Sequence, residues 1–238
     1  MKKGRADIPR VPEPRTRVEE AYGMIKQLML QQRVVAGQKL LYREMVEWLQ
    51  MSKTPIINAL NRLEQEGFIV SEANRGFSVK AMEPKEIRDA YDVREALETK
   101  AVQRAVQMGQ PRGFELLSQK VKAYEDYRHY KYDKKKFMLN AEIHLQIAAM
   151  ADNQALKYLL RRNLEHPILR VRLDNYSPAQ MAVSVKEHAR LLELMQQRQV
   201  AQCVTLVRQH ILQARDQMLA CVSQAEVESK ESQAFFED

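Results

Sequence analysis

The sequence predicts a mainly α-helical protein with two parts, a small domain of three helices and a β-hairpin and then a bundle of about six helices. Apolar residues recur at helical spacing along most of the chain, which is the main signal for amphipathic helices. Only 7 Gly and 8 Pro occur among 238 residues, too few for a loop-rich fold. Near residue 75, two short apolar runs flank a turn that contains Asn and Gly, a pattern typical of a hairpin.

The positive charge is concentrated toward the N-terminus. Residues 1–80 hold 14 Lys/Arg against 9 Asp/Glu, whereas the other residues hold 24 against 22. Such a basic excess is typical of nucleic-acid binding, although a mildly basic tail would produce it as well. No apolar run approaches the length of a membrane span and no signal core follows Met1, so we expect a cytoplasmic protein. Cys203 and Cys221 lack metal or redox spacing and are expected to pack as small apolar residues.

The small domain is expected over residues 18–82, after a charged, Pro-rich arm of 17 residues that we expect to be flexible. Its first helix is predicted to end near Gln32. Gly37 marks a turn, and a second helix is expected to follow Leu41. These elements lead into the third helix.

The third helix, expected over residues 52–66, organises the domain. Ser52 or Thr54 suits its N-cap, and Pro55 fits its first turn. Gly67 supplies a left-handed stop. One face is apolar and consists of Ile56, Ala59, Leu60 and Leu63. The other face is polar or basic at the helix N-terminus, where recognition helices meet phosphates and base edges, and consists of Lys53, Thr54, Ile57, Asn58 and Asn61.

The predicted hairpin joins residues 68–72 to residues 77–80. Three helices followed by a hairpin is the order of a winged helix-turn-helix. Arg75 at the tip would reach a phosphate or a narrow minor groove, whereas in an isolated hairpin it would be an ordinary exposed arginine.

The all-helical domain is expected over residues 86–225, after a linker at Met82–Lys85. Its fourth helix contains Pro167, which we expect to bend or interrupt it. Residues 226–238 are acidic and polar and are expected to form a frayed tail. The six predicted helices cover about 86–109, 114–124, 135–151, 154–173, 177–197 and 200–225.

Histidines in this domain suggest a metal site. Asn140 and His144 are four residues apart, so both project from one face of a helix. His188 and His210 lie in the fifth and sixth helices. Three neutral imidazoles and an amide oxygen would suit a divalent cation if they converge, which spacing alone does not decide. His129 and His166 receive no role.

The pattern of residues 18–80 resembles the winged-helix domain of the GntR family of bacterial transcription regulators. The family pattern Pro-Gly-x-x-Leu is matched by Ala36-Gly37-Gln38-Lys39-Leu40. The long motif Ser-Arg-Thr-Pro-Val-Arg-Glu-Ala-Leu is matched by the stretch from Ser52 to Gly67, and the wing's Arg-Gly by Arg75-Gly76.

The remainder resembles the FCD effector-binding domain of the FadR-type subgroup, through Tyr91-x-x-Arg94-x-x-Leu97-Glu98. Many FCD domains hold a metal through an Asp-x-x-x-His pair and two later histidines. Those positions fall on Asn140, His144, His188 and His210. The resemblance therefore implies a divalent metal at these residues, namely zinc, nickel or manganese.

Two departures from the family patterns affect the expected sites. Ile57 and Asn58 replace the family's Arg-Glu, so a side chain that typically hydrogen-bonds a guanine edge is missing. We therefore expect a nonstandard operator. Asn140 replaces Asp and removes one negative charge from the metal site, which implies weaker metal binding, more charge supplied by an effector carboxylate, or an empty pocket of the metal-free FCD kind.

The resemblance implies a homodimeric, nucleoid-associated regulator that binds a near-palindromic double-stranded DNA operator under control of a small organic acid, with no membrane partner and no enzymatic activity. Effector contact is implied for Tyr91 and Arg94, unless Arg94 instead pairs with Glu98. Two alternatives are a metal-dependent hydrolase or lyase and a helical binding module without DNA binding. The implied DNA contacts are Ser52, Lys53, Thr54, Asn58, Arg75 and Gly76.

Overall fold

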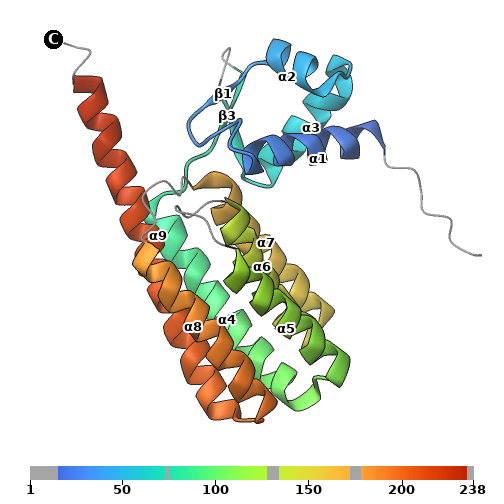
Figure 1. Cartoon of the computed structure of the whole chain (residues 1–238). Helices are drawn as coiled ribbons and strands as arrows, with labels where there is room; N and C mark the ends of the chain where they lie inside the picture. Colours follow the sequence, from blue (N-terminus) through green and yellow to red (C-terminus); the bar gives the residue numbers. More distant parts are fainter. Residues whose placement is uncertain (1–15, 73–75, 128–133, 172–177, 235–238) are drawn as a thin grey trace, which may run out of the picture.

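The computed structural model describes residues 16–72, 76–127, 134–171 and 178–234, with side chains as far as residue 224. It confirms the mainly α-helical fold, with a small N-terminal domain above a long helical domain (Figure 1). Within the described residues, no helix is both long enough and apolar enough to cross a membrane.

The N-terminal domain has three helices and a three-stranded antiparallel sheet in the order β1-β3-β2. In the register of the sheet, Leu40 is opposite Phe77 and Ile69 is opposite Val79. The sheet includes a short strand that the sequence analysis missed, because two residues are too few to show an alternating pattern. The elements are α1 (Arg17–Leu30), β1 (Lys39–Leu40), α2 (Tyr42–Leu49), α3 (Lys53–Gln65), β2 (Ile69–Glu72) and β3 (Gly76–Val79).

The apolar stripe of α3 forms the centre of this domain. All four predicted stripe residues are fully buried, and Ser52 is the N-cap residue. The helix ends before Gly67, whose φ of 79° is the left-handed conformation predicted for the stop. Because the stripe is fully inward, the polar face of α3 is turned away from the core.

The helical domain is a bundle of long helices (Figure 1). The α4 helix packs most extensively against α9. The α6 helix packs against α5, α4 and α7. One continuous apolar core runs through all of these helices. The bundle consists of α4 (Pro84–Met108), α5 (Pro111–Asp126), α6 (Lys134–Met150), α7 (Gln154–Arg170), α8 (Pro178–Gln196) and α9 (Val200–Ala234).

Two predicted boundaries were wrong, and the interruption considered at Pro167 does not occur. Pro84 and Lys85 do not belong to a linker but open α4, where Glu83 and Glu86 form a reciprocal capping box. Pro167 does not interrupt α7, because the helix ends three residues later and its buried ring removes only one hydrogen bond. The expected frayed tail continues α9 to Ala234, since residues 225–234 are rich in Ala and Glu and contain no Gly or Pro.

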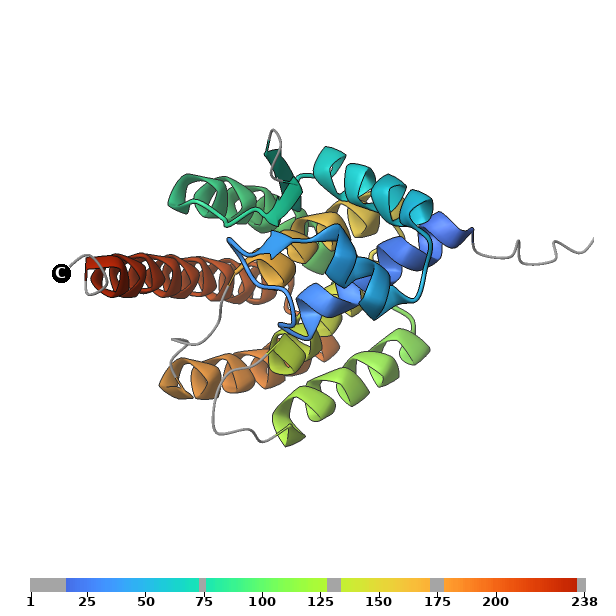
Figure 2. The same cartoon turned by 90° about the horizontal axis from the view of Figure 1, so that it is seen from above.

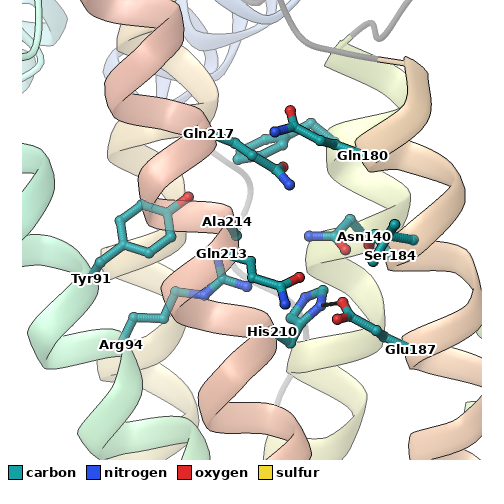
Figure 3. Close-up of a pocket in the computed structure, with 12 residues that line it drawn as sticks. Tyr91, Arg94, Asn140, Gln180, Ser184, Glu187, His210, Gln213, Ala214 and Gln217 are labelled. Carbon is teal, nitrogen blue, oxygen red and sulfur yellow. Dashed lines mark hydrogen bonds and ion pairs between the residues drawn. The ribbon is translucent and has the colours of Figure 1, made fainter.

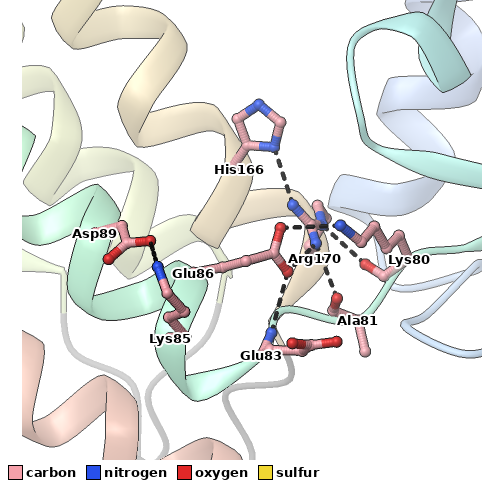
Figure 4. Close-up of polar contacts among 8 residues, drawn as sticks. All are labelled: Lys80, Ala81, Glu83, Lys85, Glu86, Asp89, His166 and Arg170. Atoms are coloured by element: carbon pink, nitrogen blue, oxygen red, sulfur yellow. Dashed lines mark hydrogen bonds and ion pairs between the residues drawn. The ribbon is translucent and has the colours of Figure 1, made fainter.

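The C-terminal end of α7 joins the two domains. The buried Arg170 side chain donates hydrogen bonds to the carbonyl oxygens of Lys80 and Ala81, at 2.9 and 2.8 Å, in the segment between the domains (Figure 4). Its Nη2 also lies 2.9 Å from Glu86 Oε2 on α4. The His166 ring stacks on Phe68 of the N-terminal domain, with 4.4 Å between ring centroids. The segment before α4 is thus fixed to α7 by a buried guanidinium.

Candidate metal centre and DNA-reading face

Three histidines from three helices meet inside the bundle. His144 lies on α6, His188 on α8 and His210 on α9, and all three are buried. One ligand atom from each lies within 4.8 Å of the others. The Nε2 atoms of His144 and His188 are 3.4 Å apart. The structure therefore brings together the three histidines that the sequence placed on separate helices.

The other ring nitrogen of each histidine faces an oxygen. His144 Nδ1 contacts the Glu98 carboxylate, and His210 Nδ1 lies 2.7 Å from Glu187 Oε2. His188 Nδ1 lies 3.5 Å from the Ser184 hydroxyl oxygen. Metal-binding histidines are held in this way in proteins, because a bond at one nitrogen orients the ring and leaves the other as the ligand.

Burial lowers the pKa of two of the three histidines. Burial lowers the pKa of His144 to about 4, against the opposing effect of Glu98. Burial also holds the pKa of His188 well below 6.5, assisted by the nearby His210. Burial alone would raise the pKa of Glu98, but its contacts with His144 and Arg94 lower it to about 2. Neutral imidazoles beside a fixed carboxylate have the protonation states that divalent cations require.

The donor atoms fit a cation. The buried Asn140 Oδ1 and His210 Nε2 have no hydrogen-bond partner among the described residues. Burying a polar atom without a hydrogen-bond partner costs free energy, and a bound cation would supply the missing partner to both atoms. In a tetrahedral zinc site with bonds of about 2.0–2.1 Å, two ligand nitrogens lie about 3.3 Å apart. The observed separation of 3.4 Å between two of the imidazoles is close to this value.

A narrow pocket lies beside this centre (Figure 3). Its volume is about 10 Å³, which is room for about one water molecule. Tyr91 and Arg94 line it from α4, and Gln213 and Gln217 from α9. The organic acid expected from the sequence is larger than this space.

Arg94 forms the ion pair that the sequence analysis weighed against effector contact. Its Nε lies 2.5 Å from Glu98 Oε1, and both side chains are buried. Arg94 also lines the pocket, so the same residue pairs with Glu98 and borders the space where an effector is expected. Glu98 was considered only as the partner of Arg94, and its contact with His144 depends on the packing of α4 against α6.

Glu187 is a site residue to which the sequence analysis gave no role. As the neighbour of His188 in sequence, it lies about 100° around the helix from that residue, and its carboxylate contacts His210 on the next helix. Ser184, Glu187 and His188 follow i, i+3, i+4 spacing and therefore share a face, a signal that was available in the sequence. Glu142, on the same helix as His144, instead pairs with Lys120, with 2.7 Å between Lys120 Nζ and Glu142 Oε2.

The outer face of α3 presents the side chains predicted to contact DNA. Ser52, Lys53, Thr54 and Asn58 are all exposed. Ile57 is only partly buried and stands among them. Gly76 begins β3 with a φ of 86°, a conformation that favours glycine. Arg75 and His129 lie outside the described residues.

The sequence matches two families of known proteins. Residues 17–79 match the family described as bacterial regulatory proteins of the gntR family. Residues 89–213, more than half of the chain, match the FCD domain. The chain belongs to the GntR family of transcription regulators and carries an FCD domain.

Named relatives of this GntR-family regulator are also transcription regulators. It is 27% identical over 193 residues to the Nta operon transcriptional regulator of Aminobacter aminovorans, covering 81% of this chain and 90% of that protein. It is 24% identical to the regulator YdhC of Bacillus subtilis strain 168, over 72% of this chain and 77% of the relative.

Solved structures share the fold of the GntR-family regulator at low identity. The E. coli protein McbR/YncC has a TM-score of 0.70 at 17% identity, with 84% of this chain and 96% of that one covered. A GntR regulator from Rhodococcus sp. RHA1 has a TM-score of 0.66 at 14% identity, with 86% and 98% covered. The two-domain fold is thus confirmed, and the protein is a DNA-binding transcription regulator of the GntR/FCD type.

Proposed function

We propose that this regulator holds a divalent cation at Asn140, His144, His188 and His210, and that a small organic acid beside the cation controls operator binding. The observation that carries the proposal is the convergence of three buried imidazoles, each oriented through its Nδ1. A bound cation, with zinc as first choice and nickel or manganese as alternatives, supplies positive charge that attracts carboxylate oxygen.

The pocket supports control through movement of helices. With a volume of about 10 Å³ beside the histidine centre, it admits an organic acid only after α4, α8 and α9 separate. Tyr91 and Arg94 would meet the acid from α4, and α4 begins at the segment held by Arg170. An effector that binds only the widened bundle would shift this segment and hence α3, because a ligand favours the state it binds better.

The outer face of α3 is the proposed reading surface. Ser52, Lys53 and Thr54 at the helix N-terminus would position the helix on phosphates and base edges. Ile57 cannot donate a hydrogen bond but can contact a thymine methyl group. The proposed contacts also include Asn58, Arg75 and Gly76.

We infer that two copies act together, since a near-palindromic operator presents two equivalent half-sites. Exposed apolar side chains on α4 and α7 support this inference, among them Val93, Tyr158 and Leu159. These two helices pack against each other. Such a dimer would act in the bacterial cytoplasm, at the nucleoid.

The metal content of purified full-length protein tests the proposal. We expect about one divalent ion per chain in the wild type and a large loss in His188→Ala, because a structural site is held by about four ligands. His166→Ala is the matched control, since it removes a histidine that lies outside the centre and should keep its metal. A wild type without bound metal after supplementation with zinc, nickel and manganese would contradict the proposal.

A further inference from the structure

A second cavity lies between the two domains, away from the histidine pocket. Its volume is about 210 Å³, and it lies between α1 of the N-terminal domain and α6 and α7 of the helical domain. Helix α1 packs against α7, and seen from above it lies over the helical domain (Figure 2). A designed cavity of about 150 Å³ in another protein holds a benzene molecule, so this space is large enough for a small organic ligand.

Gly23 leaves part of this space open. It lies in the middle of α1, where glycine costs about 0.5–1 kcal/mol of stability relative to alanine. A Cβ atom built at Gly23 would meet no other atom within 4 Å, and its φ is not of the kind that requires glycine. Neither backbone geometry nor crowding therefore explains a glycine on the wall of this cavity.

The wall is largely apolar, with a cationic edge. Leu30, Met138, Ala141, Leu145, Ile168 and Leu169 line it. Its two carboxylates are already paired, Glu165 with Lys26 at 2.8 Å and Glu142 with Lys120 at 2.7 Å. The exposed Arg161 has no ion-pair or hydrogen-bond partner among the described residues. The cavity thus combines an apolar interior with the Arg161 guanidinium, which makes no ion pair among the described residues.

We propose that this interdomain cavity binds a small amphipathic carboxylate, with its apolar body against Leu30 and Leu145 and its carboxylate on Arg161. A guanidinium matches the planar carboxylate and can donate two parallel hydrogen bonds. This site is additional to the proposed organic-acid site at the histidine centre, and it does not depend on that site.

The cavity and the histidine centre share one helix. On α6, His144 belongs to the centre and Asn140 lines the pocket beside it, whereas their neighbours Ala141 and Leu145 line the interdomain cavity. Successive helical residues are rotated by about 100°, so α6 presents one face to each site. A ligand in the cavity would touch both domains at once and would favour the arrangement of α1 on α7 described above.

Calorimetric titration of the full-length protein with 3-phenylpropionate tests this site. We expect saturable binding of about one molecule per chain, and about tenfold weaker binding of the neutral analogue 3-phenylpropanol, because a hydrogen bond to a charged group is lost. Absence of saturable 3-phenylpropionate binding by the wild type would overturn the proposal.

Three variants locate the probe. Gly23→Leu should remove the binding by filling the cavity, and its helix should be no less stable, since leucine favours helices more than glycine. Arg161→Gln should weaken binding by about tenfold or more. Lys157→Gln is the matched control, because it removes one positive charge from α7 outside the cavity and should leave the affinity unchanged.

The His188→Ala variant separates this cavity from the histidine centre. It should retain the affinity for 3-phenylpropionate. Unchanged binding in Gly23→Leu together with lost binding in His188→Ala would place the probe at the histidine centre and overturn the proposal. Thermal unfolding of each variant, followed by circular dichroism, shows that the protein is folded.

Discussion

Asn140 brings an uncharged amide oxygen into a centre whose other three proposed donors are imidazoles. The carboxylates of Glu98 and Glu187 contact the far ring nitrogens of His144 and His210, not the ligand nitrogens of the centre. A divalent cation there would be neutralised less completely than in a site with an aspartate at this position. The charge of residue 140 should therefore control the strength of metal binding.

Asn140→Asp should raise metal affinity by about tenfold or more, the equivalent of about 1.4 kcal/mol, because it adds a negative charge to the proposed ligand set. Asn140→Ala is its counterpart and should lower affinity, since it removes the donor. Competition with a chelator of known affinity measures both. Equal affinities in wild type and Asn140→Asp would show that residue 140 is not a ligand.

Lys53 offers a test of the reading surface at the scale of one residue. Lys53→Ala should weaken DNA binding and reduce by about one the slope of log affinity against log salt, as expected for the loss of one phosphate contact. Fluorescence anisotropy with DNA from upstream of the protein's own gene measures the slope. Lys157→Ala on α7 is the control with the same loss of charge, and an equal effect of both changes would argue against α3.

At the scale of elements, the sequence predicted the helices better than their contacts. The apolar stripe of α3 and the helices that carry the three histidines were predicted from the helical spacing of apolar residues. The contact of Glu187 with His210 was not predicted, because the two residues lie on different helices and the angle between α8 and α9 is not encoded in local periodicity. His166 was given no role for the same reason, since its stacking partner Phe68 lies in the other domain.

The α7 helix should make the docking of the domains sensitive to acid. Burial lowers the pKa of His166 to about 4 from an ordinary value of 6.5, and Arg170 assists. Between these pH values the unfolded chain binds more protons at this residue than the folded protein, so its contribution to stability falls as the pH falls from 6.5 toward 4.

Thermal unfolding of wild type and His166→Phe, measured from pH 7.5 to pH 5, tests this dependence. Phenylalanine keeps a ring against Phe68 but takes up no proton, so the variant should lose less stability on acidification than the wild type. Other buried histidines contribute equally to both proteins. Parallel pH profiles would show that protonation of His166 does not affect the fold.

At the scale of the whole molecule, the placement of one domain on the other was outside the reach of the sequence analysis. The family resemblance predicted both folds, and the linker was placed within a few residues. The buried Arg170, which ties α7 to the segment before α4, and the cavity beneath α1 arise only when the domains meet. Non-local contacts of this kind leave no periodic signal in the chain.

The same contacts provide a continuous route through the molecule. The α4 helix reaches from the segment held by Arg170 to the pocket residues Tyr91 and Arg94, and Glu98 further along it contacts His144. We therefore expect the state of the histidine centre to affect the position of α3. Coupling between distinct sites is typically worth about 1–3 kcal/mol, or about 5- to 150-fold in affinity.

The most direct test is the affinity for DNA from upstream of the protein's own gene, measured by anisotropy with zinc-saturated and with chelator-treated protein. We predict a change of about fivefold or more in the wild type and no change in His188→Ala, which controls for zinc bound elsewhere. Equal affinities of the zinc-saturated and metal-free wild type would contradict the account.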